Sequence, residues 1–234
     1  MYKRIILKLS GETLAPTDHS FTFAEDRVNR AAEAILKLSN RGVQVGVVMG
    51  GGNIWRGRFS KDMNAVNADQ MGMLATIINA LCVADAITRM GGKATVLTAQ
   101  EMTRFAKLYT RDTALELMNQ GHVVLLAGGS GNPFFTTDTA AALRAAELDA
   151  DAVFKGTTVD GVYDSDPRKN PDAKLIFDIS YQQCIDMDIH VMDPTAFMLC
   201  KEQGVPCIRV FAMDDLDNIL RVADGEPLGT VVHA

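Results

Sequence analysis

Short, continuously apolar stretches alternate along this chain with longer stretches in which apolar residues recur every three or four positions. The short stretches are typical of strands buried on both faces, and the longer ones are typical of helices that bury one side. The pattern predicts strands at residues 4–9, 43–49, 94–97, 122–127, 151–155, 207–211 and 230–232. It predicts helices at residues 25–40, 67–90, 111–120, 139–148, 181–187, 194–203 and 215–223.

Strands and helices that alternate in this way are the signature of a mainly parallel sheet with helices on both faces. We therefore predict an α/β fold, a three-layer αβα sandwich around a mainly parallel central sheet. The sequence shows neither an internal repeat nor a linker, so we expect one domain over residues 1–234.

Four of the predicted strands run into polar or glycine-rich turns, at residues 8–12, 50–53, 128–138 and 155–161. In open parallel sheets, ligands bind beyond the carboxyl ends of the strands. All four turns should therefore crowd one edge of the sheet and line a crevice. Because glycine lets backbone N–H groups approach closely, such a crevice suits phosphate groups.

The longest of these turns, residues 128–138, has the sequence Gly-Gly-Ser-Gly-Asn-Pro-Phe-Phe-Thr-Thr-Asp. It joins a predicted buried strand to the start of a predicted helix. The free N–H groups and the positive dipole end of a helix start favour an anion. Its two threonines and its aspartate can cap the helix or bond a ligand.

Composition and charge narrow the class of protein. Hydrophobic residues make up 47% and charged residues 22% of the chain, which is typical of a globular protein, and the net charge is -6. This charge argues against nucleic acid or an anionic membrane as a partner, because both need a basic face. We expect no membrane span, since no window approaches about 18 apolar residues. Four cysteines without C-x-x-C spacing and a start without a signal peptide predict reduced thiols in a cytoplasmic protein.

Neither G-x-x-x-x-G-K-[ST] nor a strand-linked G-x-G-x-x-G occurs in the sequence. What remains are glycine turns and lysines at strand ends. Phosphoryl transfer uses such groups, because cations stabilise the charge on the moving phosphoryl group. Lys8 and Lys155 are candidates to flank that group, and Asp138 and Asp193 to orient the lysines or to hold Mg²⁺ indirectly. By spacing alone, Asp193 is also an ordinary helix cap.

Six stretches carry a resemblance to a known family. They are KLSGE (8–12), VGVVMGGGNIWRG (45–57), DQMGMLAT (69–76), GSGNPFFTTD (129–138), KGTTVDGVYDSDP (155–167) and VMDPTAF (191–197). In this order, nearly end to end, the chain resembles the bacterial-type uridylate kinases of the amino acid kinase family. The resemblance implies transfer of the γ-phosphate of Mg-ATP to UMP, giving UDP in pyrimidine nucleotide biosynthesis. It also implies a homohexamer and inhibition by UTP.

The resemblance further implies roles for individual residues. The residues that it assigns to catalysis are Lys8, Lys155, Asp138 and Asp193. ATP binding falls to Lys8, Ser10, Gly11, Gly52, Arg56, Thr157, Tyr163 and Asp166. UMP binding falls to Gly51, Arg56, Asp69, Ser130, Gly131, Asn132, Pro133, Phe134, Phe135, Thr136 and Thr137, and Gly52 also matches a UMP-phosphate position. The acceptor site is then expected in a lobe of residues 1–150 and the ATP site in a lobe of residues 151–234. No protein ligand to the metal is expected, because Mg²⁺ is held through the ATP phosphates.

The sequence also departs from the family pattern. Residues 15–21 lack the glycines that many relatives carry there, Ala84 stands where GTP-activated relatives often have arginine, and residues 58–67 form a shorter segment than in some members. These departures leave open whether GTP activates this chain. Two alternatives stay open: a kinase of the same fold with a carboxylate or carbamate acceptor, and a nucleotide- or oxyanion-storing relative that has lost transfer.

Overall fold

The computed structural model describes residues 2–18, 20, 22–56, 62–167 and 169–234. A nine-stranded sheet runs through the molecule in the order β4-β3-β5-β2-β1-β6-β10-β11-β9. Its strands are β1 (Arg4–Leu9), β2 (Gln44–Met49), β3 (Ala94–Thr98), β4 (Lys107–Leu108), β5 (Val123–Ala127), β6 (Ala152–Thr157), β9 (Asp178–Ser180), β10 (Cys207–Ala212) and β11 (Thr230–His233). The first seven strands of that order are parallel, and β11 pairs with β10 in the antiparallel sense.

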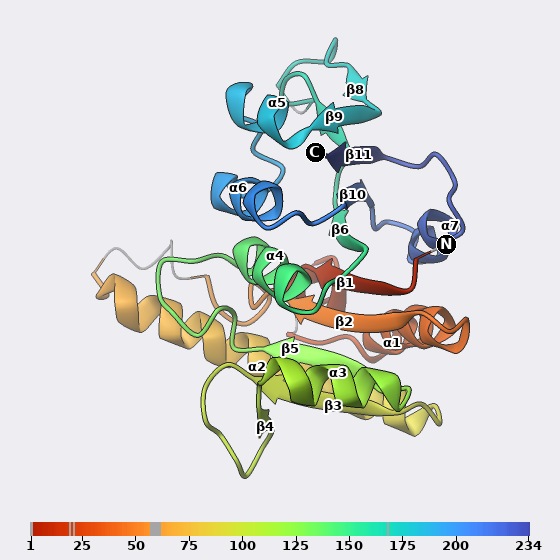
Figure 1. The fold of residues 1–234 in the computed structure, drawn as a ribbon. Coiled ribbons are helices and arrows are strands. Elements are labelled where there is room, and N and C mark those ends of the chain that lie inside the picture. Colours follow the sequence, from red (N-terminus) through yellow and green to blue (C-terminus); the bar gives the residue numbers. More distant parts are fainter. Residues whose placement is uncertain (1, 19, 21, 57–61, 168) are drawn as a thin grey trace.

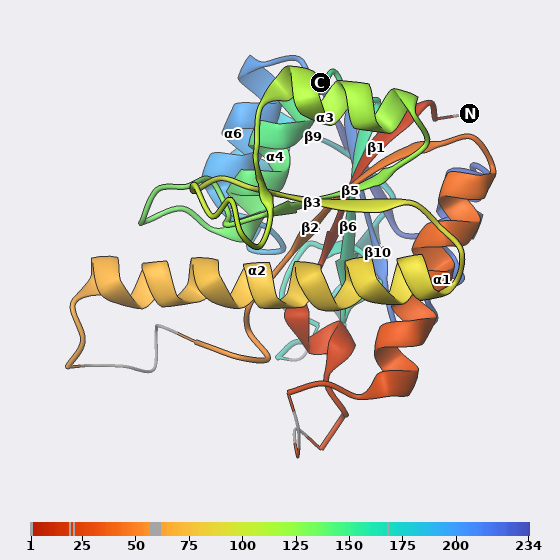
Figure 2. The same ribbon diagram turned by 90° about the horizontal axis from the view of Figure 1, so that it is seen from below.

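Helices cover both faces of the sheet (Figures 1 and 2). One face carries α1 (Glu25–Asn40), α2 (Ala65–Arg89) and α7 (Asn218–Ala223). The other face carries α3 (Arg111–Asn119), α4 (Thr137–Glu147), α5 (Tyr181–Asp186) and α6 (Pro194–Glu202). A one-turn helix, η1 (Gly11–Leu14), follows β1, and β7 (Val162–Tyr163) and β8 (Leu175–Ile176) form a separate hairpin. The three-layer αβα fold with a mainly parallel sheet is therefore confirmed.

The layers follow from the alternation of side chains along each strand. On β1, Ile5, Leu7 and Leu9 face α1 and α2, whereas Ile6 faces α4, and all four are fully buried. Lys8 shares the face of Ile6, so its side chain lies on the α4 side of the sheet. This alternation brings a lysine on a buried central strand close to the start of α4.

Helix ends are set by local sequence signals. Asp193 accepts a hydrogen bond from the amide of Thr195 and Pro194 opens α6, as the Asp-Pro pair predicts. Gly42 and Gly91 adopt the left-handed conformation just past the ends of α1 and α2, where a Cβ would be strained. The predicted starts and stops of these helices are confirmed within one or two residues.

Some elements differ from the prediction. The helix expected at 215–223 begins only at Asn218, because residues 214–217 form bends and turns. The four strands β4, β7, β8 and β9 were not predicted, since each has two or three residues and no continuous apolar run.

Within the described residues, α2 is long and apolar enough to cross a membrane by length and composition alone. The expectation that no stretch approaches such a span is wrong on that measure.

Candidate functional site

The four polar turns singled out in the sequence follow β1, β2, β5 and β6. These strands are immediate neighbours in the order β5-β2-β1-β6, and all of them are parallel. Their carboxyl ends therefore open on one edge of the sheet, and the predicted meeting of the turns is confirmed. The start of α4 and the start of α2 complete this edge.

The charged centre of the site consists of Lys8, Lys155 and Asp138. Lys8 and Lys155 are register partners on β1 and β6, so their side chains lie beside each other on the α4 face. Asp138, in the first turn of α4, receives Lys155 Nζ at 2.6 and 2.7 Å and Lys8 Nζ at 2.9 Å. Both lysines are at least nine-tenths buried. One carboxylate thus holds two buried cations at the edge of the crevice.

The pKa values of these groups follow from their surroundings. Burial and the neighbouring Lys8 ammonium lower the pKa of Lys155 to about 8, although Asp138 acts in the opposite direction. Burial alone would raise the pKa of Asp138, but the two ammonium groups outweigh it and hold that pKa below its usual value. Asp138 is therefore ionised at neutral pH, and Lys155 stays mostly protonated there but loses its proton as the pH rises through about 8.

Asp193 contacts the start of α4. Its carboxylate accepts hydrogen bonds from the hydroxyl groups of Thr136 and Thr139 and from the backbone amide of Thr195. Burial raises its pKa, but these donors outweigh burial and lower it below the usual value. Asp193 thus joins the cap of α6 to the cap of α4, and its link to the lysines runs through the helix that carries Asp138.

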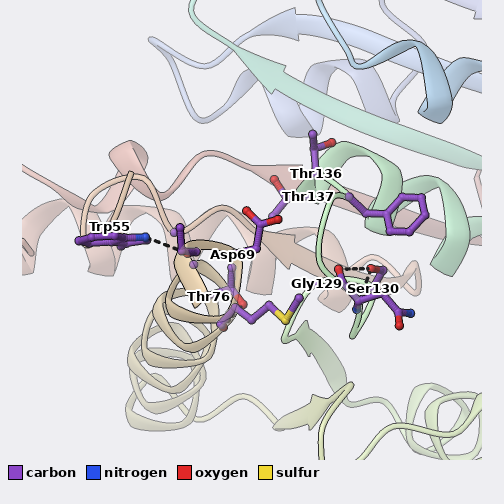
Figure 3. Close-up of a pocket in the computed structure, with 13 residues that line it drawn as sticks. Trp55, Asp69, Thr76, Gly129, Ser130, Thr136 and Thr137 are labelled. Atoms are coloured by element: carbon purple, nitrogen blue, oxygen red, sulfur yellow. Dashed lines mark hydrogen bonds between the residues drawn. The ribbon is translucent and has the colours of Figure 1, made fainter. Parts of the chain in front are cut away.

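A cavity of about 140 Å³ lies beside this centre, between α2 and the turn that follows β5 (Figure 3). Seven of its lining residues were expected at the UMP site: Gly51, Asp69, Ser130, Asn132, Phe135, Thr136 and Thr137. Six others were not expected there: Trp55, Ala68, Gly72, Met73, Thr76 and Gly129. Ala68, Gly72, Met73 and Thr76 share a helix with Asp69 at spacings of one, three, four and seven. Residues three, four and seven positions apart lie on one face of a helix. This spacing from Asp69 was the signal in the sequence that could have placed Gly72, Met73 and Thr76 at the same site.

Asp69 and Phe134 join the two walls of this cavity. Asp69 Oδ2 accepts a hydrogen bond of 2.7 Å from the backbone amide of Phe134. Phe134 itself is 72% exposed and has φ 70°, which is unusual for a residue other than glycine. Five residues expected at the UMP site do not line the cavity: Gly52, Arg56, Gly131, Pro133 and Phe134.

Arg56 lies between the turns that follow β1 and β2. Its guanidinium forms an ion pair with Glu12 and donates a 3.1 Å hydrogen bond from Nε to the carbonyl of Gly52. Ser10 caps η1 by accepting from the amide of Glu12, and Gly11 is buried beside it. The structure therefore brings Lys8, Ser10, Gly11, Gly52 and Arg56 to one corner of the crevice.

The remaining residues expected to bind ATP lie at the end of β6 or after it. Thr157 is the last residue of β6, and Tyr163 lies in β7, where its hydroxyl group donates to Asp160 at 3.2 Å. Asp166 is 4.0 Å from Lys169 Nζ. Across the described ranges, no cluster of three or more His, Cys, Asp or Glu side chains could hold a metal ion. His19, Phe21 and residues 57–61, which belong to stretches discussed above, lie outside the described residues.

Known proteins resemble this chain over nearly its whole length. The sequence profile of the amino acid kinase family matches residues 3–210. The uridylate kinases of Bacteroides thetaiotaomicron and Parabacteroides distasonis are 46% and 47% identical to it, over 99% of this chain and 98% of theirs. Among solved structures, UMP kinase from Bacillus anthracis superposes with a TM-score of 0.95 at 34% identity, covering 99% of this chain and 96% of that one. UMP kinase from Ureaplasma parvum gives 0.93 at 35% identity, with both chains fully covered.

Proposed function

The chain belongs to the uridylate kinase branch of the amino acid kinase family, and from this membership we propose that it transfers the γ-phosphoryl group of ATP to UMP. One observation supports this most: the loop of residues 130–137 and Asp69 form two walls of a cavity next to the Lys8–Asp138–Lys155 centre. A uridine nucleotide in that cavity would place its phosphate toward the turn after β2.

The acceptor side of the crevice binds UMP. Asp69 accepts hydrogen bonds from the ribose hydroxyl groups, and the loop of residues 130–137 surrounds the uracil ring. The backbone N–H groups of Gly51 and Gly52 and the side chain of Arg56 hold the acceptor phosphate. Arginine suits this role because its planar guanidinium binds phosphate oxygens with two parallel hydrogen bonds.

The donor side binds ATP together with Mg²⁺, which enters as part of the substrate and is held through the phosphates. Lys8, Ser10 and Gly11 contact the phosphates at the β1 end. Thr157, Tyr163 and Asp166 hold the base and ribose. The acceptor site thus belongs to the lobe of residues 1–150, and the ATP site belongs mainly to the lobe of residues 151–234.

The transfer itself is an in-line displacement. An oxygen of the UMP phosphate attacks the γ-phosphorus, the bond from that phosphorus to the β–γ bridging oxygen breaks, and ADP leaves. Lys8 and Lys155 stabilise the charge on the moving group, because buried cations act strongly in a site of low polarity. Asp138 positions both lysines, and Asp193 positions the helix that carries Asp138.

The same proposal extends to assembly and control. Met71, Leu74, Ile78 and Leu81 form an apolar stripe on α2 at spacings of three and four, and each is more than a third exposed. We assign this stripe to contacts within a homohexamer, the assembly that family membership suggests. UTP would inhibit by placing its uridine in the acceptor cavity. We place the reaction in the cytoplasm, in pyrimidine nucleotide biosynthesis, and expect no stimulation by GTP.

The proposal is tested by offering Mg-ATP with UMP, CMP or carbamate in parallel, each with and without GTP. We expect UDP from UMP, slower or no turnover of CMP and carbamate, and no change with GTP. Turnover of carbamate instead of UMP would favour the kinase with a different acceptor. Tight UMP binding without any transfer would favour the storing relative.

A further inference from the structure

A pair of asparagines lies beneath the two phosphate-binding turns that follow β1 and β2. Asn79 on α2 is fully buried, and Asn53 belongs to the turn after β2. Their amide groups face each other and bond in both directions: Asn79 Nδ2 donates to Asn53 Oδ1 at 2.8 Å, and Asn53 Nδ2 donates to Asn79 Oδ1 at 3.1 Å. Buried polar groups that satisfy each other in this way fix the geometry of their surroundings.

Each amide of the pair also holds backbone. Asn79 Nδ2 donates to the carbonyl of Gly50 at 2.7 Å, in the turn that begins the acceptor side. Asn53 Nδ2 donates to the carbonyl of Thr22 at 3.0 Å, in the segment that precedes α1. The pair therefore ties α2, the turn after β2 and the segment before α1 to one point.

The turn after β1 rests directly on this point. A Cβ added to Gly11 would lie 2.2 Å from Asn53 Oδ1, 2.6 Å from the carbonyl oxygen of Gly50 and 2.9 Å from Asn79 Nδ2. The absence of a side chain at Gly11 is what lets the β1 turn settle against the amides. The spacing between the donor turn and the acceptor turn is thus set by the two asparagines.

We propose that Asn79 and Asn53 are positioning residues that hold the ATP turn after β1 in register with the UMP turn after β2. This inference rests on the proposed function. Neither side chain touches a substrate in it. Instead, they act on the alignment of the γ-phosphorus with the attacking oxygen. A displacement of about 1 Å between these two atoms can lower the rate 10²-fold.

The test compares Asn79→Ala and Asn53→Ala with Leu38→Ala. Leu38 is a fully buried residue near the carboxyl end of α1, at the opposite edge of the sheet, and serves as a control for lost stability. In each asparagine variant, kcat with both substrates saturating should fall at least about tenfold. The dissociation constants for ATP alone and for UMP alone should change less than about threefold, because each turn keeps its own contacts. Leu38→Ala should lower the melting temperature and leave kcat within about threefold of the parent.

A second measurement does not depend on activity. Hydrogen–deuterium exchange of the peptides that span residues 9–15 and 49–55 should rise in the asparagine variants and not in Leu38→Ala. A kcat within threefold of the parent, a loss carried by KM alone, or unchanged exchange in both peptides would overturn the proposal. If the parent protein makes no UDP, the proposed function fails, and the exchange result still decides whether the pair holds the turns. Should Asn79→Ala not fold, Asn53→Ala carries the test, because Asn53 is only partly buried.

Discussion

Asp138 is the residue on which the electrostatics of the site depend. Its carboxylate lies within 3 Å of Lys8 and Lys155, and it is the first-turn acid of a helix whose N-terminus also favours negative charge. Two buried lysines on adjacent strands would repel each other without it. A carboxylate at this point allows both cations to face a phosphoryl group while the site holds only one excess positive charge.

Replacing Asp138 with asparagine removes this charge with little change in shape. We expect kcat to fall about 10²-fold and the KM for UMP to change less than about threefold, because the loss concerns the moving phosphoryl group. Steady-state kinetics at saturating ATP measure both constants. Asp112→Asn, at an exposed position on α3, is the matched control. If the variant instead showed only a raised KM for UMP and an unchanged kcat, Asp138 would act in substrate binding and not in the transfer step.

The pKa of Lys155, about 8, predicts a limit to activity on the alkaline side. As pH rises through about 8, Lys155 loses its proton, and a neutral amine stabilises the transferred group less well. The kcat/KM for UMP should therefore fall between pH 7.5 and 9.5, a range in which the substrate phosphates, with a second pKa near 6, stay ionised. Lys155→Arg should remove this limit where it keeps activity, because arginine stays charged. A profile that is flat to pH 9.5 in the parent would contradict the prediction.

Among the secondary-structure elements, those with strong local signals were predictable. Long buried strands show as apolar runs, and the starts of α4 and α6 show as Thr and Asp-Pro caps. The short strands β4 and β7–β9 were not, because tertiary contacts rather than an apolar run hold them; Val162 of β7, for example, donates its amide to Thr230 Oγ1 of β11. Trp55 was also not placed by sequence, since its position depends on a bond from its indole N–H to the carbonyl of Ala68 on α2.

The turn after β2 offers a spectroscopic reading of acceptor binding. Trp55 is the single tryptophan of the chain and lines the cavity, so UMP should change its fluorescence. Arg56→Ala should raise the dissociation constant for UMP at least about tenfold, since a charge-assisted bidentate contact to phosphate is lost. Arg41→Ala, which removes an exposed ion pair with Asp224, should leave it unchanged. Equal UMP affinity in Arg56→Ala and the parent would remove Arg56 from the site.

For the molecule as a whole, the parallel topology of the sheet was what made the position of the site predictable from the sequence. The meeting of four turns at one edge follows from the parallel sheet, and the structure shows that their strands are also neighbours. Contacts between residues distant in the sequence could not be predicted. Examples are the Asp69–Phe134 hydrogen bond and the Asn53–Asn79 pair. Each of these depends on where α2 lies across the ends of the strands, which no local pattern encodes.

Figure 2 shows that the amino-terminal part of α2 extends beyond the other layers. Among the described residues, none fully covers the apolar stripe of α2, whose four side chains are 37–49% exposed. Such a surface is typical of a protein contact. Ile78→Asp places a charge in the stripe and should shift the protein from the proposed hexamer to smaller species. Sedimentation velocity measures that shift. Met187→Asp, an exposed methionine at the end of α5, is the control. An unchanged sedimentation coefficient in Ile78→Asp would exclude the stripe from the assembly contacts.

The chemistry proposed for the crevice is tested most directly by following the label from ATP that carries ³²P in its γ-phosphate. The protein, Mg²⁺ and UMP are mixed with this ATP, and the products are separated over time. We predict that the label appears in the β-phosphate of UDP in step with the formation of ADP. Label that stays in ATP, or that appears only as inorganic phosphate, would contradict phosphoryl transfer to UMP at this site.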